Sequence, residues 1–66
     1  METWFQFKND EGKTALVPSS SIEVIIHKDG KYQIWILEGE RYVVEDFSII
    51  STSAQLITTL SAMKNE

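Results

Sequence analysis

The segment that decides the fold comprises residues 22 to 45 and reads IEVIIHKDGKYQIWILEGERYVVE. It contains three runs rich in β-branched and aromatic side chains, at about 22–27, 31–37 and 41–45, separated by two turns that each contain a glycine. Runs of this kind joined by short glycine turns are typical of antiparallel strands connected as hairpins. The segment therefore predicts a three-stranded antiparallel meander.

The lengths of the two turns decide which side chains share a face, because a one-residue shift in strand pairing moves every side chain to the opposite face. We expect three-residue loops at Lys28–Gly30 and Glu38–Glu40, since two loops of odd length gather the apolar residues together. In the first loop, Gly30 would adopt the left-handed conformation that follows a type I turn. The expected core face then carries Ile22, Val24, Ile26, Tyr32, Ile34, Ile36, Tyr42 and Val44.

The flanking segments add two strands and a helix. Alternating polar and apolar residues predict strands at about 2–8 and 13–17, joined by a polar turn at Gly12, and Pro18 ends the second strand. Thr52 and Gln55 fit a capping box at the start of a helix over about 53–64. Leu56, Ile57, Leu60 and Met63 form one stripe at helical spacing, so we expect this helix to pack on the sheet.

The sequence thus predicts one α+β domain over residues 1–66. Its architecture is expected to be a bent five-stranded antiparallel sheet, or a small partial (SH3-like) barrel, with one C-terminal helix. A chain of 66 residues buries only about 60% of its unfolded surface, so its large apolar residues are needed for the core.

The composition disfavours several classes of function. Ten acidic residues outnumber six basic ones, and the net charge of −4 disfavours a phosphate-binding surface. There is no cysteine, which removes thiolate metal sites and fits a cytoplasmic location. Residues 47–63 lack ionisable side chains, but this run is too short and too rich in serine and threonine to span a membrane. The residues around Trp4 show no signal-peptide pattern.

The chain offers no arrangement of residues suited to catalysis. His27 is the single histidine, and a metal site needs several convergent ligands. Neighbouring carboxylates such as Glu45 and Asp46 would point to opposite faces of a strand and would not form an acid–base pair. The three glycines are too far apart for a phosphate-binding loop. We therefore expect a protein that is not an enzyme and that has no cofactor and no metal.

Several short motifs follow one another along most of the chain: Glu11-Gly12, Ser21-Ile22-Glu23, Ile34-Trp35-Ile36-Leu37, Glu38-Gly39 and Tyr42-Val43-Val44-Glu45. Their order resembles that of the FlbD/SwrD-type group of very small bacterial proteins associated with flagella. The resemblance implies strands followed by a terminal helix, and no catalytic residues. The chain departs from the group at Glu38, where asparagine is usual, and in its uncharged helix. The flagellar role is therefore not carried over.

The leading functional hypothesis is a non-enzymatic protein-interaction module, a small bacterial or phage accessory protein whose partner is another protein or a second copy of the chain. Either the N-terminal hairpin covers the reverse face of the meander, or a partner does. Aromatic and arginine side chains beside apolar neighbours are typical of interface centres. Alternatives are an acidic inhibitor that mimics nucleic acid, and a single-stranded nucleic-acid binder that stacks bases on its aromatic rings. The candidate protein-binding residues are Trp35, Leu37, Ile25, Val43, Arg41 and Trp4.

Overall fold

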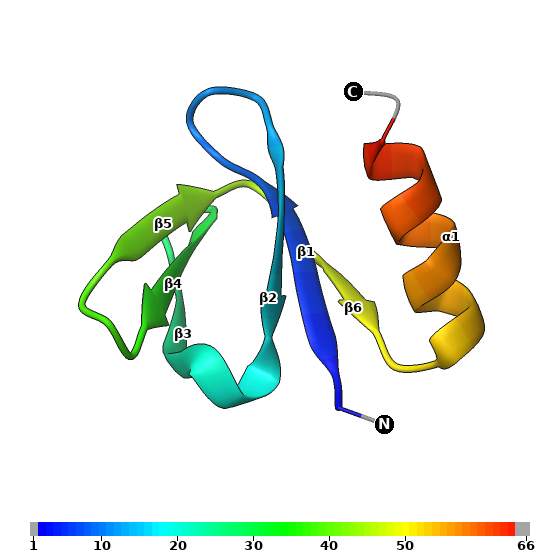
Figure 1. The fold of residues 1–66 in the computed structure, drawn as a ribbon. Helices are drawn as coiled ribbons and strands as arrows, with labels where there is room; N and C mark the ends of the chain where they lie inside the picture. The colour runs from blue at the N-terminus through cyan, green and yellow to red at the C-terminus, as the bar shows by residue number, and fades with distance from the viewer. Residues whose placement is uncertain (1, 65–66) are drawn as a thin grey trace.

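The computed structural model describes residues 2–64, which form six β-strands, one short 3-10 helix and one α-helix (Figure 1). The strands make two separate antiparallel sheets of three strands each. The N-terminal sheet has the order β2 (Thr14–Pro18), β1 (Trp4–Lys8), β6 (Ser48–Ile50), and the central sheet has the order β3 (Ile22–Lys28), β4 (Lys31–Ile36), β5 (Arg41–Val44). The prediction of a single five-stranded sheet or partial barrel is therefore wrong, although the fold is α+β.

Two features distinguish this arrangement from the predicted single sheet. Pro18 lacks an N–H and ends β2, and the 3-10 helix Ser19–Ser21 then redirects the chain into β3. The sixth strand, β6, pairs with the other edge of β1 and places Ile50 opposite Trp4. Sequence reasoning missed β6, which has only three residues and lies between the last predicted strand and the predicted helix.

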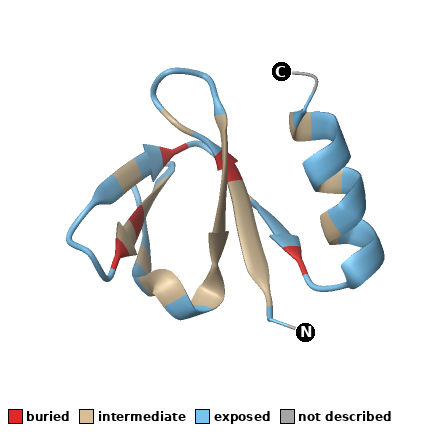
Figure 2. Ribbon diagram, in the orientation of Figure 1, coloured by how far each residue is buried: buried red, intermediate tan, exposed pale blue. Residues whose placement is uncertain are grey.

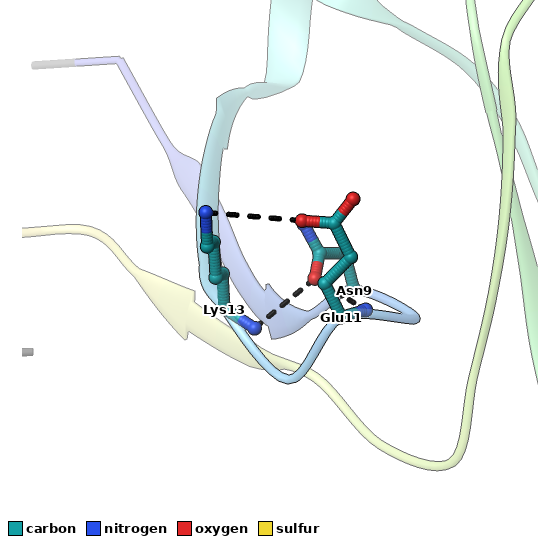
Figure 3. A network of polar contacts seen from close by, with 3 residues as sticks. All are labelled: Asn9, Glu11 and Lys13. Carbon is teal, nitrogen blue, oxygen red and sulfur yellow. Dashed lines mark hydrogen bonds and ion pairs between the residues drawn. The ribbon is translucent and has the colours of Figure 1, made fainter.

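The turn between β1 and β2 is held by the side chain of Asn9 (Figure 3). Its Oδ1 accepts hydrogen bonds from the backbone N–H groups of Glu11 and Lys13, each at 3.0 Å. Gly12 has a φ of +78°, a conformation that glycine adopts without steric cost. Asn9 thus substitutes for a backbone acceptor and fixes the geometry of the N-terminal hairpin.

The turn between β3 and β4 has two residues, Asp29 and Gly30, and not the three that were expected. Both have positive φ, +54° and +76°, as a type I′ turn requires, and Lys28 pairs directly with Lys31. Because the turn has two residues and not three, the faces of β3 are inverted: its side chains point to the side of the sheet opposite to the one predicted. Ile25 pairs with Ile34, on the core side.

A β-bulge limits this inversion to part of β3. The register shifts between Ile22 and Val24, so that Glu23 is the extra residue and Ile22 still pairs with Ile36 as predicted. Ile22 and Ile25 therefore both pack against the core, while Val24 and Ile26 do not. Their predicted place in the core is wrong.

The turn between β4 and β5 has the predicted length of three residues but begins one residue earlier, at Leu37. The Ile36 N–H donates to the Glu40 carbonyl and the Gly39 N–H donates to the Ile36 carbonyl, both at 2.9 Å. Moving the loop by one residue changes the pairing by two positions, which leaves each side chain on the same face. Ile34 consequently pairs with Tyr42, and Tyr32 with Val44, on the core side.

The hydrophobic core lies between the two sheets (Figure 2). Phe7 of the N-terminal sheet is buried with Ile34, Ile36 and Val44 of the central sheet, and its ring centroid lies 5.2 Å from that of Tyr42. Half-buried apolar side chains surround this cluster: Ala15, Val17, Ile22, Ile25, Tyr32, Tyr42 and Phe47. The N-terminal hairpin thus covers the face of the central sheet that was predicted to lie beneath the helix.

The helix α1 (Ser53–Met63) begins as predicted but packs differently. The Gln55 N–H donates to Thr52 Oγ1 at 3.2 Å and the Thr52 N–H donates to Gln55 Oε1 at 3.1 Å, which confirms the capping box. No residue of α1 is buried, and Ile57 and Leu60 are 64% and 44% exposed. The helix lies near β6, on the side of the molecule away from the central sheet (Figure 1). The expectation that its apolar stripe closes the main core is wrong.

Candidate protein-binding surface

The outer face of the central sheet is set by strand register. Cross-strand partners point to the same side of a sheet, and residues two apart along a strand do so too. Trp35 pairs with Val24 and with Arg41, and Gln33 pairs with Ile26 and with Val43. We call these six residues the Trp35 face: Val24, Ile26, Gln33, Trp35, Arg41 and Val43.

The Trp35 face is apolar and open to solvent. Val24, Ile26 and Val43 are 44%, 41% and 40% exposed, and Trp35 is half-buried among them. The Arg41 guanidinium carbon lies 5.4 Å from the centroid of the Trp35 ring, within the range of a cation–π interaction. This contact orders one long side chain beside the apolar centre.

The structure brings three of the six candidate residues together on this face, namely Trp35, Arg41 and Val43. Ile25 points the other way and packs against the core. Leu37 is exposed in the β4–β5 loop. Trp4 is half-buried in the N-terminal sheet, opposite Pro18 and Ile50.

Sequence reasoning missed Val24 and Ile26 as members of the surface. Both were assigned to the core because a three-residue turn was assumed at Lys28–Gly30. The signal that could have found them is the dipeptide Asp29-Gly30, which favours a two-residue type I′ turn. The N-terminal hairpin, one of the two covers considered for this face, packs on the opposite face through Phe7.

Three hollows occur on the described part of the surface, and one of them borders the Trp35 face at Val43. One, of about 390 Å³, lies between β6 and α1 and has an apolar wall that includes Ile49, Ile50 and Ala54. Another, of about 230 Å³, is lined by Phe7, Phe47 and polar side chains of β1 and β2. The third, of about 440 Å³, is at the end of β5 beside Val43 and Asp46. No cysteine or histidine is among their lining residues.

Two tyrosines on the core side of the central sheet make further side-chain contacts, Tyr42 through its hydroxyl and Tyr32 through its ring. The Tyr42 hydroxyl donates to Glu40 Oε2 at 2.8 Å, and this hydrogen bond to a carboxylate, followed by burial and by the charges of Glu40 and Glu38, raises the Tyr42 pKa. The imidazole of His27 stacks on Tyr32 with 4.4 Å between ring centroids, and Phe47 meets Tyr32 edge-on. His27 is thus packed against an aromatic ring, and within residues 2–64 no group of three acidic or histidine side chains is arranged to hold a metal ion.

No protein-family model matches this chain, and searches of curated proteins and of solved structures give no match either. Over residues 2–64, no helix combines the length and the apolar character needed to cross a membrane.

Proposed function

We propose that this protein is a non-enzymatic protein-interaction module that binds a partner protein through the Trp35 face. The observation that carries the proposal is the exposure of Val24, Ile26 and Val43, each 40% or more, around a half-buried tryptophan. The opposite side of the same sheet already supplies the core through Ile34 and Val44. The apolar side chains of the Trp35 face are therefore available for contact with another molecule.

The form of the surface supports a macromolecular partner. Sites for small molecules are concave and enclose most of their ligand. The Trp35 face is the outer side of a three-stranded sheet, and of its six residues Val43 alone lines any of the three hollows described above. Tryptophan and arginine together are enriched among the residues that dominate the affinity of protein interfaces.

The setting that we propose is that of a small bacterial or phage accessory protein in the cytoplasm. The absence of cysteine suits a reducing compartment. The resemblance of the motifs between Glu11 and Glu45 to FlbD/SwrD-type proteins supports a bacterial source and an accessory role.

The proposal can be tested by affinity capture from the native cell with the wild-type chain and two variants, Trp35→Ala and Ile26→Asp. We expect a discrete partner protein to be retained by the wild type and lost with both variants. The matched control is Ile57→Asp, which makes the same substitution at an exposed isoleucine of α1, remote from the Trp35 face.

Melting curves of the purified variants establish that each one is folded at the capture temperature. A partner that is retained by folded Trp35→Ala and Ile26→Asp, or lost with Ile57→Asp alone, would show that binding uses another surface.

A further inference from the structure

The charges around the Trp35 face identify the kind of partner segment that fits it. Resting on the function proposed above, we infer that the Trp35 face binds an acidic amphipathic segment of a partner protein, in which carboxylates flank an apolar centre.

Basic residues are concentrated on this side of the central sheet. Lys28 and Lys31 pair with each other and lie on the same side of the sheet as Trp35. Lys28 is two residues from Ile26 along β3, and Lys31 is four residues from Trp35 along β4. Together with Arg41 they are three of the six basic residues in a chain whose net charge is −4. Within β3, β4 and β5 the single acidic residue is Glu23, at the bulge. The three strands therefore carry more basic than acidic side chains, while the other acidic residues of this segment lie in the adjoining turns and after β5, at Asp29, Glu38, Glu40, Glu45 and Asp46.

The three cations have no carboxylate partner in the part of the chain that the structure describes. The ion pair found within residues 2–64 joins Lys13 to Glu11, at 3.8 Å, in the β1–β2 turn. Glu40, the acidic neighbour of Arg41 in the chain, accepts the hydrogen bond of the Tyr42 hydroxyl. The ammonium and guanidinium groups are thus available to pair with carboxylates of a bound segment, with Arg41 already ordered over Trp35.

Two other occupants fit less well. A symmetric dimer through this face would bury the same patch of both copies, so the cations Lys28, Lys31 and Arg41 of one copy would face the same basic patch of the other, which is unfavourable. A single-stranded nucleic acid gains much of its affinity from bases that stack on several aromatic rings. Here the Trp35 ring is contacted by Arg41, and its neighbours Val24, Ile26 and Val43 are aliphatic.

The test is selection of a displayed library of random peptides on the immobilised full chain. A parallel selection uses the Trp35→Ala variant, so that peptides which need this face are identified by subtraction. We expect the Trp35-dependent peptides to be enriched in aspartate and glutamate beside aromatic or aliphatic residues.

The affinity of one selected peptide is then compared with that of its copy in which glutamine and asparagine replace the acidic residues. We expect the acidic peptide to bind roughly tenfold more tightly at low salt, because several exposed charge pairs each contribute a small factor. The advantage should shrink as salt is added. It should also shrink in the double variant Lys31→Gln/Arg41→Gln, whereas Lys13→Gln/Lys64→Gln serves as the control for lost charge.

The outcomes distinguish failure of this inference from failure of the proposed function. Trp35-dependent peptides without an acidic bias, or equal affinity of the acidic and amide peptides, would overturn this inference and leave the proposed function standing. A selection in which no peptide depends on Trp35 would overturn both. Binding of a thymidine oligonucleotide, or self-association in sedimentation that the Trp35→Ala variant abolishes, would assign the face to a different occupant.

Discussion

Tyr42 shows how one side chain serves both the core and the polar rim. Its ring contacts Phe7 between the two sheets, while its hydroxyl donates to the Glu40 carboxylate. A phenol that donates to a carboxylate holds its proton more tightly, and burial and the nearby negative charges act in the same direction. The Tyr42 pKa is therefore raised above the usual 10.0.

This shift predicts a loss of stability in alkali. The folded chain binds the Tyr42 proton more tightly than the unfolded chain does. The contribution of Tyr42 to the free energy of unfolding is therefore complete below the unfolded pKa of 10.0, and it is lost as pH rises through the higher pKa of the folded state. Absorbance titration of tyrosinate in the Tyr32→Phe variant isolates Tyr42, and its midpoint should lie above 10.0.

Glu40→Gln should lower that midpoint more than Glu38→Gln does, because the hydrogen bond to Glu40 is the largest cause and the charge of Glu38 the smallest. A midpoint that does not respond to Glu40→Gln would contradict the contact between Tyr42 and Glu40.

At the scale of the element, β3 is the strand whose orientation most affects the surface. Four of its first five residues are aliphatic, Ile22 and Val24 to Ile26, so its hydrophobic pattern fits either face. The Asp29–Gly30 turn and the bulge at Glu23 together select Ile22 and Ile25 for the core. The same selection places Val24 and Ile26 on the Trp35 face.

Adjacent isoleucines provide a matched test of this register. Ile25→Ala should lower the free energy of unfolding by about 2 kcal/mol, since Ile25 packs against the buried cluster. Ile26→Ala should lower it by less than about 1 kcal/mol, because Ile26 is on the exposed side. Urea unfolding of both variants measures the difference. A larger loss of stability for Ile26→Ala than for Ile25→Ala would indicate the three-residue turn that the apolar pattern favoured.

At the scale of the whole molecule, the core depends on contact between the two sheets. Phe7 is the buried residue that the N-terminal sheet contributes to the central cluster, and α1 contributes none. Ile50 is buried as well, but in β6 and outside that cluster. The molecule is thus stabilised chiefly by sheet-on-sheet packing, with the helix at its periphery.

Two substitutions distinguish this architecture from one in which the helix closes the core. Phe7→Ala should cost about 3–5 kcal/mol and unfold much of the protein. Leu60→Asp should cost less than about 1 kcal/mol, because Leu60 is 44% exposed and no residue of α1 is buried. Thermal unfolding followed by circular dichroism checks both. Unfolding caused by Leu60→Asp would instead support the prediction that the helix packs on the sheet through its apolar stripe.

The sequence by itself determined the local features of this protein. Strand runs at 22–27 and 41–45, the capping box of Thr52 and Gln55, and the length of the loop before β5, though not its position, follow from patterns within a few residues of each other. Of the candidate surface, Trp35, Arg41 and Val43 were identified from residue type and alternation. These features depend on turn chemistry, capping and period, which short segments encode.

Only the tertiary structure decided which faces are covered. Leu56, Ile57, Leu60 and Met63 form as regular an apolar stripe as any strand does, yet Phe7, Ala15 and Val17 reach the central sheet instead. The short β6 likewise exists because β1 offers it a free edge. The physical reason is that a hydrophobic pattern states how much apolar surface an element can bury but not which partner buries it. That choice depends on competition among distant segments for the same surface.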